Sequence, residues 1–178
     1  MKPTFFISCP IDTYSGYGAR SRDVVKAIIE MDKYDVKILP QRWGATPWGF
    51  IEDHEEWNFL NKHFFYPQPN QQYPKPDIWM QITIPNEFQP QGHYNIGMTA
   101  GIETTLCKPE WIQGCNRMSM VVGSSEHTIQ VLKNSKFQKK DNNTQQILEN
   151  IELTTKTEVL FEGFDEKVYK KTNEVLDL

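Results

Sequence analysis

Residues 4–39 read TFFISCPIDTYSGYGARSRDVVKAIIEMDKYDVKIL, and this stretch decides the fold. Its first part, Thr4–Cys9, is a short apolar run of β-type residues, which predicts a buried strand. From Ala19 to Met31, apolar side chains recur at the spacing of one helix face. A second β-type run follows at Asp35–Leu39. Strand, loop, helix and strand in this order predict a βαβ unit with parallel strands and a right-handed crossover.

The same alternation of strand-like and helix-like segments continues along the chain. Further strands are expected at Asp77–Thr83, Tyr94–Ala100, Met118–Val122 and Glu158–Phe161. One helix is expected over Pro109–Met118, because Pro is well tolerated in a first turn. Another should run to Lys133, with Ser124 and Ser125 as candidate N-caps. The 178 residues therefore predict a single α/β domain, a Rossmann-like three-layer sandwich with a mainly parallel sheet.

Three segments lack this regular alternation. We expect Gln41–Lys75 to form a loop, a short helix over the sequence EDHEEWNFLNKHF and a Pro- and Gln-rich surface linker. Gln138–Thr157 is polar, which predicts either a long loop or an inserted helix. The tail that ends at Leu178 is expected to be helical or frayed.

Composition and charge exclude several classes of function. A net charge of −4 provides no basic surface, so we expect no nucleic-acid binding. No apolar run approaches the roughly 20 residues of a membrane span, and the N-terminal run is too short for a secretory signal. We therefore expect a cytoplasmic protein. The 3 cysteines have no paired spacing and the 4 histidines form no zinc-binding pattern, which predicts reduced thiols and no metal.

The loop between the first strand and the first helix holds a candidate binding site, Gly16-Tyr17-Gly18. Glycines allow a ligand to approach the backbone, and the positive end of the helix favours a phosphate or another anion. A tight turn that only joins strand to helix would use the same residues. The spacing is not G-x-G-x-x-G, and no acidic residue stands after the second strand, which argues against a dinucleotide site.

A set of later motifs occurs in a characteristic order. The motifs are NIGMTAGIET (95–104), KPEWI (108–112), CNRM (115–118), VVGSS (121–125) and VLFEGFD (159–165). With the glycine loop, this ordered set resembles the N-terminal domain of family-4-like glycosyltransferases of the GT-B fold. In that group, a Thr and a Glu precede a Pro-x-Trp helix, an Asn follows, and a Glu-Gly-hydrophobic-Asp turn closes the domain.

The resemblance implies that the chain is one half of an enzyme. In such proteins two Rossmann-like domains face each other across a cleft; the N-terminal one binds the acceptor and the C-terminal one holds the nucleotide-sugar. We therefore expect residues 1–178 to be a single acceptor-side domain for hexosyl transfer from a nucleotide-sugar to an acceptor hydroxyl. The C-terminal donor-binding domain is missing from this sequence, so we expect the isolated chain to be inactive. The nucleotide-sugar is a co-substrate, and no cofactor is expected.

The motifs also provide candidate site residues. Glu103 follows the fourth strand at the edge where α/β sheets bind ligands, and we predict that it is the general base; a structural role near the Pro109 helix is the alternative. The predicted substrate-binding residues are Gly16, Tyr17, Gly18, Ser124, Ser125, Glu162 and Gly163. Helix capping is the alternative role for the two serines, and a structural or interdomain role for Glu162. We expect the glycine loop, Glu103 and Ser124 to surround a single groove.

Two other functions stay open at this stage. A non-catalytic Rossmann-like module that binds a sugar, a nucleotide or a protein would have the same fold and the same loop. A flavodoxin-like or nucleotide-binding oxidoreductase is a weaker alternative, which would require a bound flavin or nicotinamide.

Overall fold

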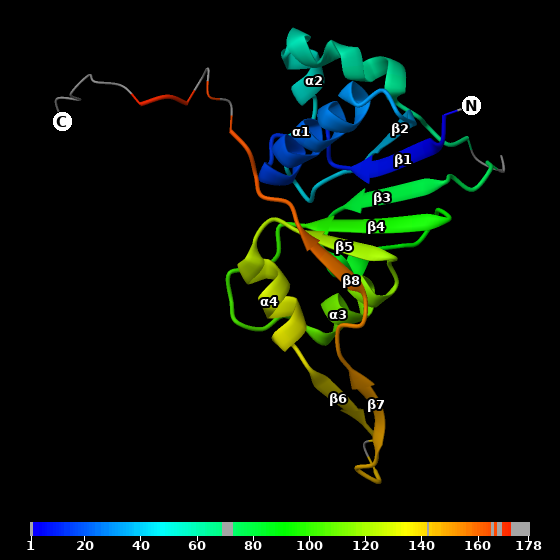
Figure 1. Cartoon of the computed structure of the whole chain (residues 1–178), viewed down its shortest axis with the longest axis vertical. Coiled ribbons are helices and arrows are strands. Elements are labelled where there is room, and N and C mark those ends of the chain that lie inside the picture. The colour runs from blue at the N-terminus through cyan, green and yellow to red at the C-terminus, as the bar shows by residue number, and fades with distance from the viewer. Residues whose placement is uncertain (1, 69–72, 142, 165, 167–168, 172–178) are drawn as a thin grey trace.

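The computed structural model describes residues 2–68, 73–141, 143–164, 166 and 169–171. Within this part of the chain, the strands of the central sheet follow the order β2-β1-β3-β4-β5-β8 (Figure 1). Every pair of neighbouring strands in this sheet is parallel. Its strands are β1 (Thr4–Cys9), β2 (Asp35–Pro40), β3 (Ile78–Ile82), β4 (Tyr94–Thr99), β5 (Met120–Gly123) and β8 (Lys156–Val159). The expected α/β class with a mainly parallel sheet is confirmed.

Helices flank the sheet on both faces and form the outer layers of a Rossmann-like sandwich (Figure 1). They are α1 (Gly16–Glu30), α2 (Phe50–Asp53), α3 (Pro109–Asn116), α4 (Glu126–Asn134) and the 3-10 helices η1 (Glu55–His63) and η2 (Pro85–Glu87). Side chains of α1, α2 and η1 belong to one core cluster, and those of α3 and α4 to another. Each face of the sheet therefore packs against its own set of helices.

Strand alternation separates the two core clusters. In β1, Ile7 is fully buried and packs on the α1 side, in the cluster that contains Val25 of α1. Phe6, the preceding residue, packs on the opposite side, in the cluster that contains Ile112 of α3 and Leu132 of α4. Successive side chains of a strand point to opposite faces, so an apolar run such as β1 is buried on both.

Two glycines permit close packing on the α3 side of the sheet. A Cβ atom on Gly97 of β4 would lie 2.5 Å from the ring of Phe88, and one on Gly114 of α3 would lie 1.8 Å from the carbonyl oxygen of Pro85. The missing side chains therefore allow η2 and its Phe88 to pack between β4 and α3. This contact positions the connection that follows β3.

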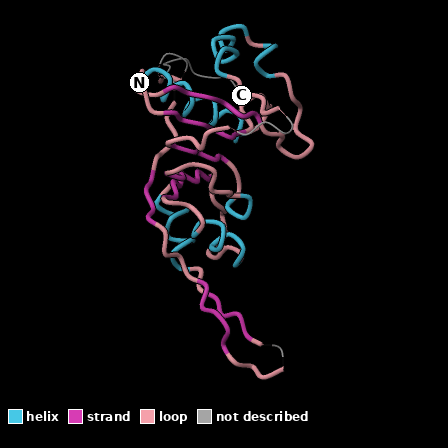
Figure 2. Tube along the Cα trace, turned by 90° about the vertical axis from the view of Figure 1, so that its right-hand side faces the viewer, coloured by secondary structure: helices cyan, strands magenta, loops and turns pink. Residues whose placement is uncertain are grey.

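The polar segment after α4 differs from the prediction. Gln138–Thr157 was expected to be a loop or a helix, and this expectation is wrong: the region contains an antiparallel hairpin, β6 (Phe137–Lys140) and β7 (Ile147–Ile151). The hairpin extends away from the rest of the molecule in both views (Figures 1 and 2). Phe137 and Ile151 pair at its base and pack into the α3–α4 core, which attaches an otherwise exposed ribbon to the domain.

Smaller differences concern boundaries. The expected helix over EDHEEWNFLNKHF divides into α2 and η1, because His54 has an extended backbone with φ −134°. β8 ends at Val159, and Leu160 and Phe161 are exposed instead of extending the strand. Much of the tail that was expected to be helical or frayed, namely residues 165, 167–168 and 172–178, lies outside the described residues.

Candidate functional site

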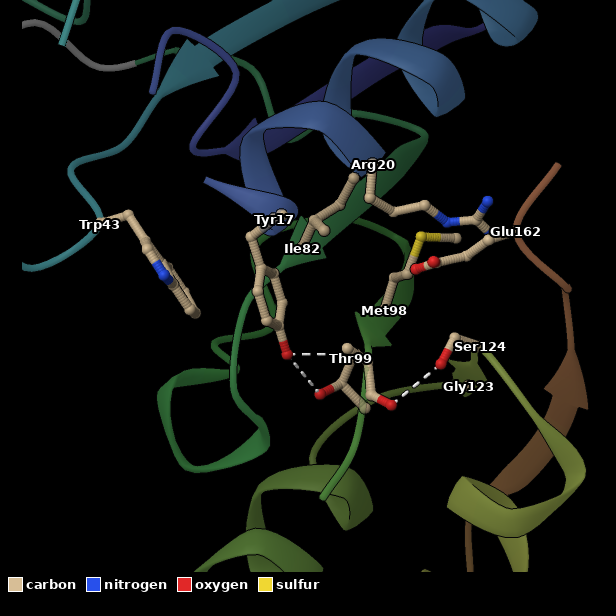
Figure 3. A pocket seen from close by; sticks show the side chains of 11 residues that line it. Tyr17, Arg20, Trp43, Ile82, Met98, Thr99, Gly123, Ser124 and Glu162 are labelled. Carbon is tan, nitrogen blue, oxygen red and sulfur yellow. Dashed lines mark hydrogen bonds between the residues drawn. The ribbon is translucent and has the colours of Figure 1, made fainter. Parts of the chain in front are cut away.

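A cavity of about 210 Å³ lies at the carboxyl edge of the sheet, between the N-terminus of α1 and the ends of β3, β4 and β5 (Figure 3). The α1 side and the loop after β2 contribute Gly16, Tyr17, Arg20 and Trp43. The strand ends contribute Ile82, Met98, Thr99, Ala100, Gly123 and Ser124, and the segment after β8 contributes Glu162. This is the edge at which parallel α/β sheets bind ligands.

Tyr17 joins the two walls of the cavity. Its hydroxyl accepts a hydrogen bond from the Ala100 N–H at 3.1 Å and lies 3.1 Å from Thr99 Oγ1. Its ring stacks on Trp43 with centroids 4.1 Å apart, which fixes both aromatic side chains at the rim. Burial raises the pKa of Tyr17, and the negative charges of Glu87 and Glu103 act in the same direction. The phenol is therefore protonated at neutral pH and is not a base.

The start of α1 is fixed by local hydrogen bonds. Ser15 is the N-cap, and its hydroxyl accepts from the Gly18 N–H at 2.9 Å. Thr13, which is fully buried, lies 2.8 Å from the Ser15 hydroxyl and donates to the carbonyl of Pro10. The positive end of the α1 dipole therefore lies at the cavity, beside Gly16.

Arg20 connects α1 to the segment after β8. Its Nη2 donates to the carbonyl of Leu160 at 2.6 Å and to that of Phe161 at 3.3 Å. These bonds hold the chain so that the next residue, Glu162, extends into the cavity (Figure 3). A guanidinium and a carboxylate thus line the same wall, and the guanidinium provides the positive charge of the cavity.

The two serines after β5 have different surroundings. Ser124 lines the cavity and donates to the Ala100 carbonyl at 2.9 Å. Ser125 is the N-cap of α4, where its hydroxyl accepts from the Thr128 N–H at 3.1 Å, and it is absent from the cavity wall. Thr128 of α4 also donates to the Ala100 carbonyl, at 2.8 Å, so that Ser124 and Thr128 share one acceptor just after β4.

The remaining predicted residues do not line the cavity. Gly18 is buried against Thr13 and is not part of the cavity wall. Glu103 is exposed in the loop after β4 and does not line the cavity, although its charge acts on Tyr17. Gly163 is also exposed and outside the wall. The sequence predicted that Gly16, Gly18, Glu103 and Ser124 surround a single groove. The structure brings Gly16 and Ser124 to the cavity, and Gly18 and Glu103 lie outside its wall.

Several lining residues were not predicted from the motifs. Thr99 and Ala100 contribute a hydroxyl and a backbone N–H where β4 ends, and both bond to Tyr17. Ile82 and Met98 form the apolar floor at the ends of β3 and β4. The sequence feature that could have identified these residues is their position at strand ends, because the carboxyl ends of neighbouring parallel strands meet at one edge.

A smaller polar cavity of about 50 Å³ adjoins the first one. The two share Trp43 and Ile82 as lining residues. The polar side chains of the smaller cavity are Ser8, Gln41, Arg42, Gln81, Thr83 and Glu87. Thr83 donates to the Glu87 carboxylate at 2.5 Å, which orients a second acidic group at this edge.

The described residues contain no group of three or more His, Cys, Asp and Glu side chains arranged to hold a metal ion. Within the same part of the chain, no helix has both the length and the apolar character of a membrane span. Comparison with protein-family models, with curated proteins and with solved structures found no match to this chain.

Proposed function

We propose that this chain is the acceptor-side domain of a GT-B glycosyltransferase, and that the carboxyl-edge cavity receives the acceptor sugar. One observation carries the proposal: four residues from three separate motifs, namely Gly16 and Tyr17 of the glycine loop, Ser124 and Glu162, line a single cavity. These are motifs on which the resemblance rests. Motifs that serve one function must bring their residues together in space. These residues meet at the edge where parallel α/β sheets bind ligands.

The chemistry of the wall suits a saccharide. Trp43 offers an aromatic surface on which the apolar face of a pyranose ring can pack. The Ser124 hydroxyl and the Glu162 carboxylate offer polar partners for sugar hydroxyls. Arg20 and the positive end of α1 favour a negative group beside them, such as the diphosphate of a donor. We propose a nucleotide-sugar as that donor.

The general base is proposed to be an acidic residue at this rim. Glu103 is the candidate from the motif, and its loop begins at Gly101, which has φ +91°. Its carboxylate must come within hydrogen-bond distance of the acceptor hydroxyl, roughly 2.6–3.2 Å, to act. Glu162 already lines the cavity and is the competing candidate.

A non-catalytic sugar-binding module is the second candidate function. The observation that favours it is the exposed position of Glu103 outside the cavity wall. Both functions require saccharide binding at the same cavity. They differ only in whether transfer takes place once a donor-binding domain is present.

Binding by the whole chain tests what the two candidates share. We expect the methyl glycosides of common hexoses to shift the amide NMR signals of Tyr17, Ala100 and Ser124. Trp43→Ala should abolish these shifts, because it removes the aromatic wall. Tyr66→Ala is the matched control, since this exposed ring lies outside the cavity and should leave binding unchanged. Absence of binding by every glycoside, or binding that persists in Trp43→Ala, would refute the proposal.

A further inference from the structure

A larger groove lies on the face of the sheet opposite α1. Its volume is about 630 Å³, within the usual range of ligand sites, roughly 300–1,000 Å³. It lies over β2, β1 and β3, and the segment before β3 forms one wall. The aromatic side chains of its lining are Phe6, Phe65, Tyr73 and Trp79. The amide side chains are Gln41, Gln81, Gln89 and Gln91.

The aromatic rings form a connected wall. Phe65 contacts Phe6 with ring centroids 5.2 Å apart and Tyr73 with centroids 4.8 Å apart. Trp79 of β3 contributes to the same lining, and its exposed fraction is 8%. Its indole Nε1 is buried and has no hydrogen-bond partner among the described residues. A buried donor without an acceptor is costly, and such a group in a native structure calls for an explanation, of which an ordered water or a bound molecule is one.

The groove shares lining residues with a cavity that adjoins the candidate site. It shares Ser8, Gln41 and Gln81 with the small polar cavity. That cavity shares Trp43 and Ile82 with the carboxyl-edge cavity. Shared lining residues therefore link the carboxyl-edge cavity, past Trp43, to the aromatic wall, and this succession of lining residues forms a strip.

We propose that this strip binds an extended acceptor: a linear, uncharged oligosaccharide whose terminal unit occupies the carboxyl-edge cavity and whose preceding units lie in the aromatic groove. The proposal rests on the proposed function and adds to it the substrate class.

The chemistry of the groove favours a neutral saccharide. Flat apolar faces of pyranose rings pack on aromatic side chains, and amides both donate to and accept from hydroxyls. Among the described lining residues, Lys75 alone is charged, so the groove lacks the cluster of positive charges that an anionic polymer requires. Gln81 is held in place by two hydrogen bonds, from its Nε2 to the Glu87 carbonyl at 3.1 Å and to its Oε1 from the Gln89 N–H at 2.8 Å. The Gln81 side chain is therefore preorganised.

Chain length is the variable that tests this inference. The dissociation constants of neutral gluco-, manno- and N-acetylglucosamine oligomers of one to six units would be measured on the whole chain by NMR titration. We expect at least one series to bind roughly tenfold more tightly at three or more units than at one, because each added ring gains an aromatic contact. The signals of the Trp79 indole and the Gln91 amide should shift with the longer members only.

Two groove variants separate the two sites. Phe65→Ala should remove the gain in affinity that longer oligomers show, and it should leave the affinity for single units unchanged. Because Phe65 also packs on its neighbours, Gln91→Ala is the second variant; this exposed side chain should reduce the gain several-fold without affecting folding. Tyr66→Ala again serves as the control.

The possible results of these titrations distinguish the extended acceptor from the proposed function. Equal affinity for one unit and for longer oligomers overturns the extended acceptor and leaves the proposed function standing. A length-dependent gain that survives in both groove variants also overturns it. Failure of all saccharides to bind overturns both proposals. Binding of a proline-rich peptide in the groove, with saccharides confined to the carboxyl-edge cavity, overturns the extended acceptor in favour of a peptide site.

Discussion

Replacement of Gly18 by alanine is expected to destabilise the fold, although alanine is the better helix former by about 1 kcal/mol. A Cβ atom at this position would lie 2.2 Å from the backbone oxygen of Thr13 and 2.7 Å from its Oγ1. Thr13 is fully buried and bonded to Pro10 at 2.8 Å, so it cannot yield without moving the turn.

The magnitude follows from three contributions. Overpacking of this kind costs ~1–3 kcal/mol. A shift of α1 also weakens the Ser15 cap on the Gly18 N–H, which contributes ~1 kcal/mol. The helix-propensity gain offsets ~1 kcal/mol. The expected net loss in the free energy of unfolding is therefore about 2 kcal/mol.

Gly16→Ala is the matched control. A Cβ atom on Gly16 would meet nothing within 4 Å, although the two glycines are separated by one residue and belong to the same helix turn. With no clash to offset the helix-propensity gain, we expect its free energy of unfolding to stay unchanged or to rise by up to ~1 kcal/mol. Because Gly16 lines the cavity, this variant should alter saccharide binding instead.

Urea unfolding measures the difference directly. Gly18→Ala should unfold at a lower urea concentration with an unchanged slope, and its Tm should fall by about 4–8 °C for a chain of this size. Equal stability of the two variants would show that the Thr13–Gly18 contact does not constrain α1. In that case the assignment of Gly18 to packing, rather than to ligand binding, would be refuted.

Two further predictions concern stability. Asn116→Ala should cost about 1–2 kcal/mol in urea unfolding, because Asn116 donates to the Glu152 carbonyl at 2.8 Å and accepts from the Thr154 N–H at 2.9 Å; an unchanged midpoint would contradict this. Burial raises the pKa of Cys9 and of Cys115 to about 12, whereas unfolded thiols ionise near 8.5. The folded state retains these protons as the pH rises and the unfolded state loses them, so stability should fall above about pH 9, by up to ~1.4 kcal/mol per pH unit and thiol. Urea curves between pH 7 and 10.5 measure this slope, which should be smaller in Cys9→Ala; equal slopes would refute the assignment.

The strands of the sheet could be predicted because they are buried on both faces. Thr4–Cys9 was predicted to its last residue, since no polar side chain needs to face water along it. The hairpin could not be predicted in this way. Of its paired residues, Phe137 and Ile151 alone pack into the core, and the others, such as Gln138 and Asn150, are exposed. Its strands therefore lack an alternating apolar pattern.

β8 shows the opposite error, in which apolar residues predicted too much. Leu160 and Phe161 continue the apolar run, yet their exposed fractions are 49% and 66%. Their carbonyls bond to Arg20, which lies 140 positions from Leu160 in the chain. A contact between such distant residues leaves no local signal in the sequence.

Part of the candidate site could be predicted from the positions of its residues relative to the strands. Gly16 and Ser124 follow strands, and strand ends converge in any parallel sheet, so their presence at the cavity required no knowledge of distances. Gly18 and Ser125 belong to the same motifs but have packing and capping roles. Motif membership could not distinguish these roles, because they depend on which atoms from other segments lie within a few ångströms.

The groove on the open face follows from how β2 is connected to β3. This connection returns across β1, and a helix placed opposite α1 would have covered the surface of β2, β1 and β3. Instead, Ile51 of α2 and Leu60 of η1 pack on the α1 side. The rest of the connection carries Pro67, Pro74 and Pro76, which are incompatible with a helix interior. The prolines that predicted a surface linker thus line an open groove over β1 and β3, because a chain unable to form a helix leaves this part of the sheet face without a helical cover.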